Sequence, residues 1–398
     1  MNKPLSGHGR TLVLPASDGR LVPYRLTGEP LPAAAPAAPF SRIAFSAAHV
    51  VADPLKTAEP ACGVAIDFGA TLGYRRHLAG LGLDIAEAMD TAQRGMGLTW
   101  PQALELIGET VAALADRPQT RIFSGVGTDH VQPETITSPD AVAAAYLEQL
   151  HAVQKLGSGV ILMASRALAR VAKGPADYEA VYARVLAEAD RPVILHWLGE
   201  AFDPQLAGYW GTSHFSAALE TVTGLIAAHA GKVDGIKISL LDAGAEIALR
   251  RRLPAGVKMY TGDDFNYPAL IRGDEQGFSH ALLGIFDSIA PAASLALSAL
   301  ARGDEAAFDR ILAPTVPLSR TIFRAPTYAY KTGVVFLAWL NGFQPHFTML
   351  AGAQAQRSIG YFAEVFRLAD QAGLLADPDL ALHRMKTLLA LHGLSGEP

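Results

Sequence analysis

The sequence contains a single cysteine, Cys62, so an intrachain disulfide and a thiolate metal cluster are both excluded. Charged residues are also scarce, at 18% of the chain, and the formal net charge at pH 7 is −5. No block of lysine or arginine stands out, which argues against a nucleic-acid partner or a basic membrane anchor. The N-terminal residues 1–4 lead into polar residues rather than into the apolar segment of a secretory signal. We therefore expect a cytoplasmic globular protein.

Apolar residues, in contrast, make up 50% of the 398 residues and suit a large buried core. The most apolar window, residues 281–300, contains Asp287 and Pro291 and is typical of a buried strand and helix, not of a membrane span. Short, almost continuously apolar runs are typical of parallel strands that are covered on both faces. Eight such runs follow one another, at residues 42–48, 83–89, 121–126, 159–164, 192–197, 235–240, 257–261 and 281–286.

Segments with helical spacing separate these runs, and some have clear start signals, such as Ser138-Pro139-Asp140 before residues 141–156. Eight strands alternating with helices favour an α/β fold, the (β/α)₈ or TIM barrel. An open doubly wound sheet is the alternative, but no glycine-rich phosphate loop follows the first strand.

Two further segments flank the predicted barrel. Residues 11–24 contain two apolar runs around an Asp-Gly turn, which predicts a β-hairpin, and the Pro/Ala-rich residues 30–39 predict a linker. Four helices are expected beyond the barrel, at residues 304–312, 330–340, 358–372 and 378–392. The predicted organisation is an N-terminal hairpin and linker (1–40), a catalytic barrel (41–302) and a C-terminal helical segment (303–398).

The active site of a TIM barrel forms at the carboxyl ends of its strands, so polar residues there are the candidate site residues. Those expected to act in catalysis are Lys237, His196, Asp129 and His130. Those expected to bind substrate are His49, Glu87, Asp90, Thr91, Arg94, Thr128, Ser165, Ser239, Asp263 and Asp264. Three histidines, several carboxylates and one lysine at a single barrel mouth exceed what solubility requires.

Lys237 carries the most information, because it lies within Gly235-Ile236-Lys237-Ile238-Ser239, a strand whose other face carries isoleucine. Helices cover the outer face of a barrel strand, so this lysine must point inward, where burial favours the neutral amine. A neutral amine is the nucleophile that forms a Schiff base with a ketone or aldehyde. The other interpretations are a structural lysine paired with a carboxylate such as Asp263, and a non-covalent contact with the substrate.

His196 ends the strand next to that of Lys237, and histidine is suited to relay protons near neutral pH. A satisfied core histidine is the alternative interpretation. Asp129 or His130 would supply a second acid or base. Arg94 could donate two hydrogen bonds to a substrate carboxylate or hydroxyl pair, or form a salt bridge. Either aspartate of the pair at 263–264 could cap the following helix.

A rival hypothesis joins His49, Glu87, Asp129 and His196 into a nitrogen and oxygen site for a divalent metal. It predicts a metal-dependent sugar isomerase, epimerase or hydrolase on the same barrel. No local ligand motif such as H-E-x-x-H supports it. The segment Tyr328-Ala329-Tyr330-Lys331-Thr332-Gly333 is an unusual aromatic and basic cluster beyond the barrel. Core packing is its default interpretation, and lining the site or a subunit contact is the alternative.

Four segments between Arg42 and Gly333 resemble motifs of one superfamily, in matching order and spacing. They are Ser124-Gly125-Val126-Gly127-Thr128, Arg191-Pro192-Val193-Ile194-Leu195, Val233-Asp234-Gly235-Ile236-Lys237 and Tyr260-Thr261-Gly262-Asp263-Asp264. The chain thus resembles the dihydrodipicolinate synthase/N-acetylneuraminate lyase superfamily of lysine-dependent aldolases. Within it, the chain is most similar to an uncharacterised bacterial family that is dihydrodipicolinate synthase-like. The resemblance implies a TIM barrel with C-terminal helices, an imine on Lys237 without another cofactor, and a homo-oligomer (dimer or tetramer).

Two departures from that pattern affect the expected substrate. His196 stands where the superfamily has a relay tyrosine, and residues 90–95 replace a threonine-rich glycine loop that holds a keto acid carboxylate. A carboxylate substrate would face Asp90 unless Arg94 compensates for the repulsion. We therefore expect a Schiff-base lyase, aldolase or dehydratase whose small-molecule substrate is a keto compound derived from a sugar or cyclitol.

Overall fold

The computed structural model describes residues 10–34, 36–56 and 65–394, so Cys62 and residues 1–4 lie outside the described residues. Its centre is a closed barrel of parallel strands in the order β10-β3-β4-β5-β6-β7-β8-β9. The strands are β3 (Ala44–Ala47), β4 (Asp84–Glu87), β5 (Ile122–Val126), β6 (Gly159–Leu162), β7 (Val193–Leu198), β8 (Val233–Ser239), β9 (Lys258–Thr261) and β10 (His280–Leu283). Each overlaps one predicted run, and the TIM barrel is confirmed.

The strands form a barrel because their side chains are apolar on both faces. Phe45, Ile161, Ile194 and Tyr260 belong to one buried cluster inside the barrel, where the rings of Phe45 and Phe123 lie 5.2 Å apart. The alternate residues of the same strands pack under the helices. Burial on both faces explains why these runs are so uniformly apolar in the sequence.

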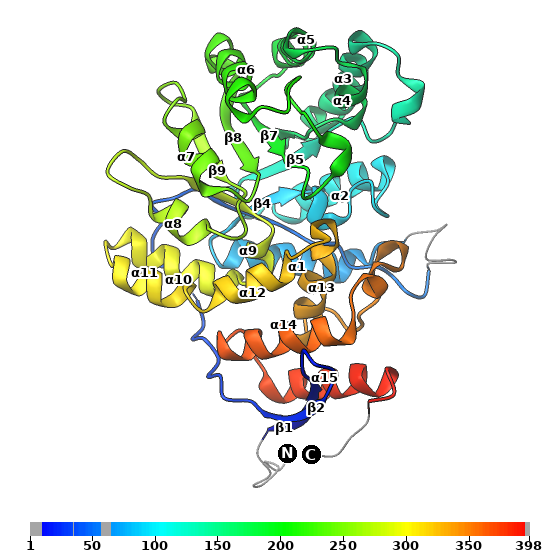
Figure 1. The fold of residues 1–398 in the computed structure, drawn as a ribbon, viewed down its shortest axis with the longest axis vertical. Helices are drawn as coiled ribbons and strands as arrows, with labels where there is room; N and C mark the ends of the chain where they lie inside the picture. Colours follow the sequence, from blue (N-terminus) through cyan, green and yellow to red (C-terminus); the bar gives the residue numbers. More distant parts are fainter. Residues whose placement is uncertain (1–9, 35, 57–64, 395–398) are drawn as a thin grey trace.

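Helices follow the strands and surround them (Figure 1). They are α1 (Phe68–Gly80), α2 (Trp100–Ala113), α3 (Pro139–Lys155), α4 (Arg166–Val171), α5 (Pro175–Ala187), α6 (Phe215–Ala228), α7 (Ala243–Arg250), α8 (Tyr267–Arg272), α9 (Ile285–Ser288) and α10 (Ala290–Ala301). The start signal predicted for α3 is confirmed, since the Ser138 hydroxyl accepts a hydrogen bond from the backbone N–H of Ala141. None of the helices in the described part of the chain is long and apolar enough to cross a membrane.

The predicted hairpin is also confirmed, as β1 (Thr11–Pro15) paired with β2 (Leu21–Arg25). It packs against the C-terminal helices α14 (Ile359–Gln371) and α15 (Pro378–Leu391), as Figure 1 shows. The Asp370 carboxylate accepts hydrogen bonds from the Tyr24 hydroxyl at 2.7 Å and from the backbone N–H of Thr27 at 2.9 Å. The N-terminal residues therefore support the C-terminal helices rather than the barrel.

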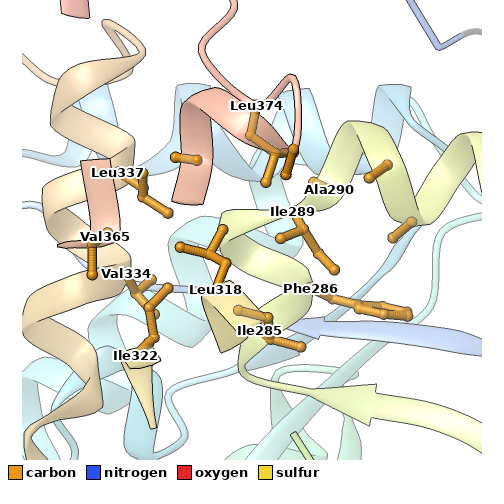
Figure 2. Close-up of a cluster of buried hydrophobic side chains, with 14 of the residues drawn as sticks. Ile285, Phe286, Ile289, Ala290, Leu318, Ile322, Val334, Leu337, Val365 and Leu374 are labelled. Atoms are coloured by element: carbon orange, nitrogen blue, oxygen red, sulfur yellow. The ribbon is translucent and has the colours of Figure 1, made fainter. Parts of the chain in front are cut away.

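The other C-terminal helices are α11 (Glu305–Leu312), α12 (Thr315–Ile322) and α13 (Tyr330–Leu340), and every residue of α13 is buried. Figure 2 shows Ile285 and Ile289 of the barrel's α9 segment packed among Leu318, Val334 and Leu337. One apolar core thus continues across the predicted boundary at residues 302–303. Separate barrel and C-terminal domains remain a prediction.

Candidate active site at the carboxyl ends of the barrel strands

A cavity of about 250 Å³ lies among the loops that follow β4 to β7. Five predicted site residues line it: Asp90, Arg94, Thr128, Asp129 and His196. Arg166, Asp203 and Lys331, which were not among the predicted site residues, line it too. The cavity is at the barrel end where TIM barrels place their active sites.

Lys237 lies in β8, inside the barrel, and only 7% of its surface is exposed. It is the register partner of His196 in β7, which lines the cavity. Burial lowers the pKa of Lys237, while the charges of Asp90 and Asp264 oppose that shift. No carboxylate oxygen of the described residues lies within 4.0 Å of its amine. Lys237 is therefore a buried amine without an ion-pair partner in the described part of the chain.

Glycine at position 262 gives the Lys237 side chain its space. A Cβ atom on Gly262 would lie 2.7 Å from Cε of Lys237 and 2.2 Å from Oγ of Ser239. Both distances are too short for carbon and oxygen atoms in contact. Any larger residue at position 262 would therefore clash with Lys237 and Ser239.

His196 is buried and neutral. Burial lowers its pKa well below the usual value, and the neighbouring charge of Lys237 acts in the same direction. Its Nε2 atom lies 3.2 Å from the Ser239 hydroxyl, and Nδ1 has no hydrogen-bond partner among the described residues. Ser239 thus orients the ring through Nε2, and the buried Nδ1 atom is left without a partner among the described residues.

The two aspartates after β9 have different environments. Burial raises the pKa of Asp264 to about 7, and its carboxylate accepts a hydrogen bond from the backbone N–H of Ile285 at 2.9 Å. Asp263 instead accepts hydrogen bonds from the backbone N–H groups of Phe265 and Asn266, at 2.8 and 3.0 Å. The charge of Lys237 therefore acts on Asp264. Asp263 instead stabilises the backbone of the loop after β9.

Arg94 does not have a free face for a substrate. Its Nε and Nη2 atoms donate to the Asp129 carboxylate at 2.7 and 2.9 Å, and its remaining N–H groups reach the Ala88 and Gly125 carbonyls and the Gln149 side chain. The expected hydrogen bonds from Arg94 to a substrate are therefore corrected to a buried ion pair. Burial alone would raise the pKa of Asp129, but Arg94 and Gln149 lower it, so Asp129 stays ionised and is a poor proton donor.

His130 lies outside the cavity. Its Nδ1 atom is 2.7 Å from Nε2 of Gln149, and Nε2 lies 3.3 Å from the Glu148 carboxylate, both on α3. The ring therefore faces a helix on the outside of the barrel. The expectation of catalysis by His130 is corrected for this reason.

Glu87 and His49 also lie behind the barrel wall. Glu87 accepts two hydrogen bonds from Arg75 of α1, each 2.8 Å long, and His49 Nδ1 lies 2.8 Å from the Asp287 carboxylate. Because Ala86 faces the barrel interior, Glu87 must face the helices. Both expectations of substrate binding are corrected by this geometry.

The side chains proposed as metal ligands do not lie close together. Glu87 and His49 are held in separate pairs, and Asp129 is bound to Arg94. Within the ranges that the structure describes, no three side chains of histidine, cysteine, aspartate or glutamate gather as metal ligands would. The geometry does not support the rival hypothesis of a metal site.

The hydroxyl residues mainly hold the loops around the cavity. Thr128 Oγ1 lies 2.7 Å from Oγ of Ser165, which caps α4, and Thr128 also lines the cavity. Thr91 Oγ1 lies 2.8 Å from the hydroxyl of Tyr330 on α13. The loop after β4 is therefore joined directly to the C-terminal helices.

Lys331 lines the cavity, in agreement with the alternative interpretation of the cluster at 328–333 as part of the site. It lies on α13, is 4% exposed, and donates hydrogen bonds to the Tyr328 carbonyl at 3.1 Å and to the Met96 sulfur at 3.2 Å. Burial lowers its pKa to about 8, while Asp90 and Asp203 oppose that shift. The aromatic and basic cluster at 328–333 was the sequence signal for it.

A family model described as "Protein of unknown function (DUF993)" matches residues 12–394. The chain belongs to the DUF993 family. This confirms the predicted similarity to an uncharacterised family, and the match includes both the barrel and the C-terminal helices. No curated protein sequence matches the chain.

Solved structures of the dihydrodipicolinate synthase family share the fold of this DUF993 chain. Dihydrodipicolinate synthase from Thermotoga maritima has a TM-score of 0.63 at 14% identity, covering 84% of this chain and 99% of that one. YagE, a prophage protein of the same family from E. coli K12 solved with pyruvate, has a TM-score of 0.62 at 14% identity, covering 89% and 99%. Dihydrodipicolinate synthase from Aquifex aeolicus has a TM-score of 0.59 at 13% identity, covering 90% and 100%. At such identities the likeness establishes the fold alone.

Proposed function

We propose that this protein is a Schiff-base lyase, of the aldolase or dehydratase type, in which Lys237 attacks the carbonyl group of a keto compound. The observation that carries the proposal is the position of Lys237: its amine is buried in the barrel, has no carboxylate within 4.0 Å among the described residues, and neighbours His196 at the cavity wall. A buried amine that lacks an ion-pair partner loses its proton more easily than an exposed lysine. The neutral amine is the reactive form.

The reaction begins when the neutral amine of Lys237 adds to the carbonyl carbon. The resulting carbinolamine takes up a proton and loses water to give a protonated imine. The protonated imine then accepts the electron pair released when an adjacent C–C or C–H bond breaks, which gives an enamine. In the dehydratase case the enamine next expels the neighbouring hydroxyl group, which leaves as water once it has been protonated. Neutral His196 accepts or returns the proton involved, since its Nδ1 atom has no hydrogen-bond partner among the described residues. Asp264 has a pKa of about 7 and is therefore partly protonated near neutral pH. Its ionised form stabilises the positive charge of the imine on Lys237.

The cavity wall supports a hydroxylated substrate derived from a sugar or cyclitol. Asp90 presents a carboxylate that makes no side-chain hydrogen bond among the described residues, and Arg94 is already bound to Asp129. A keto acid carboxylate placed beside Asp90 would be repelled by it. Hydroxyl groups, in contrast, donate hydrogen bonds to a carboxylate.

The same proposal includes the cellular setting. The imine chemistry needs no cofactor beyond Lys237, and we propose a cytoplasmic homo-oligomer, a dimer or tetramer, acting on a small carbonyl compound. The support is the similarity in fold and motifs to the dihydrodipicolinate synthase superfamily.

Reduction with borohydride in the presence of candidate keto compounds tests the proposal, because it converts an imine into a stable secondary amine. We expect a mass increase on the peptide that contains Lys237. The adduct should be absent in Lys237→Arg and retained in Lys386→Met, which changes an exposed lysine. An unmodified peptide across sugar-, cyclitol- and pyruvate-type ketones would overturn the proposal. Bound divalent metal that activity requires would favour the metal-dependent alternative.

A further inference from the structure

Two charged groups on the cavity wall stand apart from its ion pairs. Four of the six charged residues that line the cavity neutralise one another: Arg94 with Asp129, and Arg166 with Asp203. The other two, Asp90 and Lys331, have no oppositely charged side chain within 4.0 Å in the described part of the chain. They contribute the uncompensated charges of the cavity.

The ammonium group of Lys331 has an N–H donor that no described residue accepts. This group has three N–H donors, of which one reaches the Tyr328 carbonyl and one the Met96 sulfur, a weak acceptor. The group also lies 4.6 Å from the ring centroid of Tyr330. At 4% exposure it has little contact with water, so an acceptor from a ligand in the cavity would stabilise it.

Asp90 offers the matching acceptor. Its half-buried carboxylate makes no side-chain hydrogen bond to a described residue, and its charge stabilises the protonated form of Lys331. The two groups are close enough to interact electrostatically, yet more than 4.0 Å apart. A ligand between them must accept from an ammonium and donate to a carboxylate. Hydroxyl groups do both, whereas a carboxylate cannot donate and an ammonium cannot accept.

We propose that Asp90 and Lys331 form a hydroxyl-binding subsite that selects keto compounds with neighbouring hydroxyl groups. This inference rests on the proposed imine chemistry at Lys237 and assigns the recognition step to a different pair of residues. It also makes α13, which lies outside the barrel, part of the active site.

Two four-carbon ketones of matched length test the subsite: erythrulose, which has hydroxyl groups on its other three carbons, and butan-2-one, which has none. The readout is the concentration of each ketone that gives half-maximal borohydride-trapped adduct on Lys237. We expect Asp90→Asn and Lys331→Met each to raise this concentration for erythrulose about tenfold, as the loss of a charged hydrogen bond would. The value for butan-2-one should not change in Lys331→Met. In Asp90→Asn it should change less than the value for erythrulose, because the lost charge also acts on the pKa of Lys237. Lys386→Met should alter neither value.

Each other result has a definite meaning. An equal effect on both ketones, or no effect on either, would overturn the subsite while leaving the imine chemistry in place. If the wild type forms no adduct with any ketone, the proposed function fails. The subsite is then tested separately, by measuring the binding of a polyol that cannot form an imine. For that purpose, saturation-transfer NMR with erythritol, a polyol without a carbonyl group, should detect binding to Lys237→Met and lose it when Lys331→Met is added. Unchanged erythritol binding would overturn the subsite.

Discussion

At the scale of single residues, Lys237 and Asp264 influence each other's proton. Burial disfavours both charges, which lowers the pKa of Lys237 and raises that of Asp264 to about 7. A negative charge on Asp264 favours the ammonium form of Lys237 and therefore opposes nucleophilic attack. Burial, the charge of Asp90 and the charge of this carboxyl group thus together determine the pH at which the amine becomes reactive.

Asp264→Asn tests this coupling. The asparagine oxygen can still accept the hydrogen bond from the Ile285 N–H, but the negative charge is gone. Without that charge the pKa of Lys237 falls, so a larger fraction of the amine is neutral at a given pH. We expect the midpoint of the pH profile for borohydride trapping with erythrulose to move to lower pH, by roughly one unit or less. A midpoint that stays in place or moves upward would show that the two groups are not coupled.

The role of a strand residue could be predicted only where the sequence shows whether its side chain points into the barrel or toward the helices. The inward direction of Lys237 followed from the isoleucines on the opposite face. Glu87 was assigned to the mouth although it alternates with Ala86, and only the strand register shows which of the two faces the interior. The partner of Arg94 could not be predicted, because Asp129 and Gln149 come from other elements of the barrel.

At the scale of elements, long apolar patterns were more informative than short ones. The eight strands and α13 were predicted from their apolar runs, because burial on all sides leaves a strong signal. Helix α12 was missed, since it has only eight residues and contains Pro317, which usually interrupts a helix. The aromatic and basic segment at 328–333 was the sequence signal for a role of α13 in the site, but which of its side chains reaches the cavity depends on how the C-terminal helices pack on the barrel mouth.

Helix α7 contains a carboxyl group that should make stability depend on pH. Glu246 is buried, accepts a hydrogen bond from Ser279, and has its pKa raised by burial to about 8. The folded protein therefore holds a proton that the unfolded chain loses above about pH 4.5. As the pH rises from about 4.5 to about 8, the contribution of Glu246 to the free energy of unfolding falls. Above about pH 8 this contribution no longer changes with pH.

Glu246→Gln removes the ionisation. We expect the variant to gain stability relative to the wild type at pH 8 by on the order of 1 kcal/mol or more, and to gain less or lose stability at pH 5. Urea denaturation at both pH values measures the difference. Glu305→Gln, at an exposed position of α11, is the matched control. A pH-independent difference for Glu246→Gln would contradict the expectation.

At the scale of the whole molecule, the barrel and the C-terminal helices share one core. Ile285 and Ile289 are fully buried against Leu318 and Leu337, which lie beyond the predicted boundary (Figure 2). Removing these contacts would expose a large apolar surface of the barrel.

A truncated chain that ends at residue 302 tests whether the barrel can fold without the C-terminal helices. We expect the fragment to aggregate or to lack a cooperative unfolding transition, whereas the full chain should unfold in one transition by circular dichroism. Soluble expression of the fragment with a cooperative melt would instead establish the barrel as an independent domain.

The position of Lys331 has a consequence for the order of events during synthesis. The ribosome makes Lys237 and every barrel strand before it reaches α13, and Asp370, which binds the N-terminal hairpin, comes later still. A nascent chain that has not yet reached α13 would thus carry the amine without the residue that we assign to hydroxyl recognition, and without the helices that complete the core of the barrel. Selectivity among ketones would be acquired only near the end of translation.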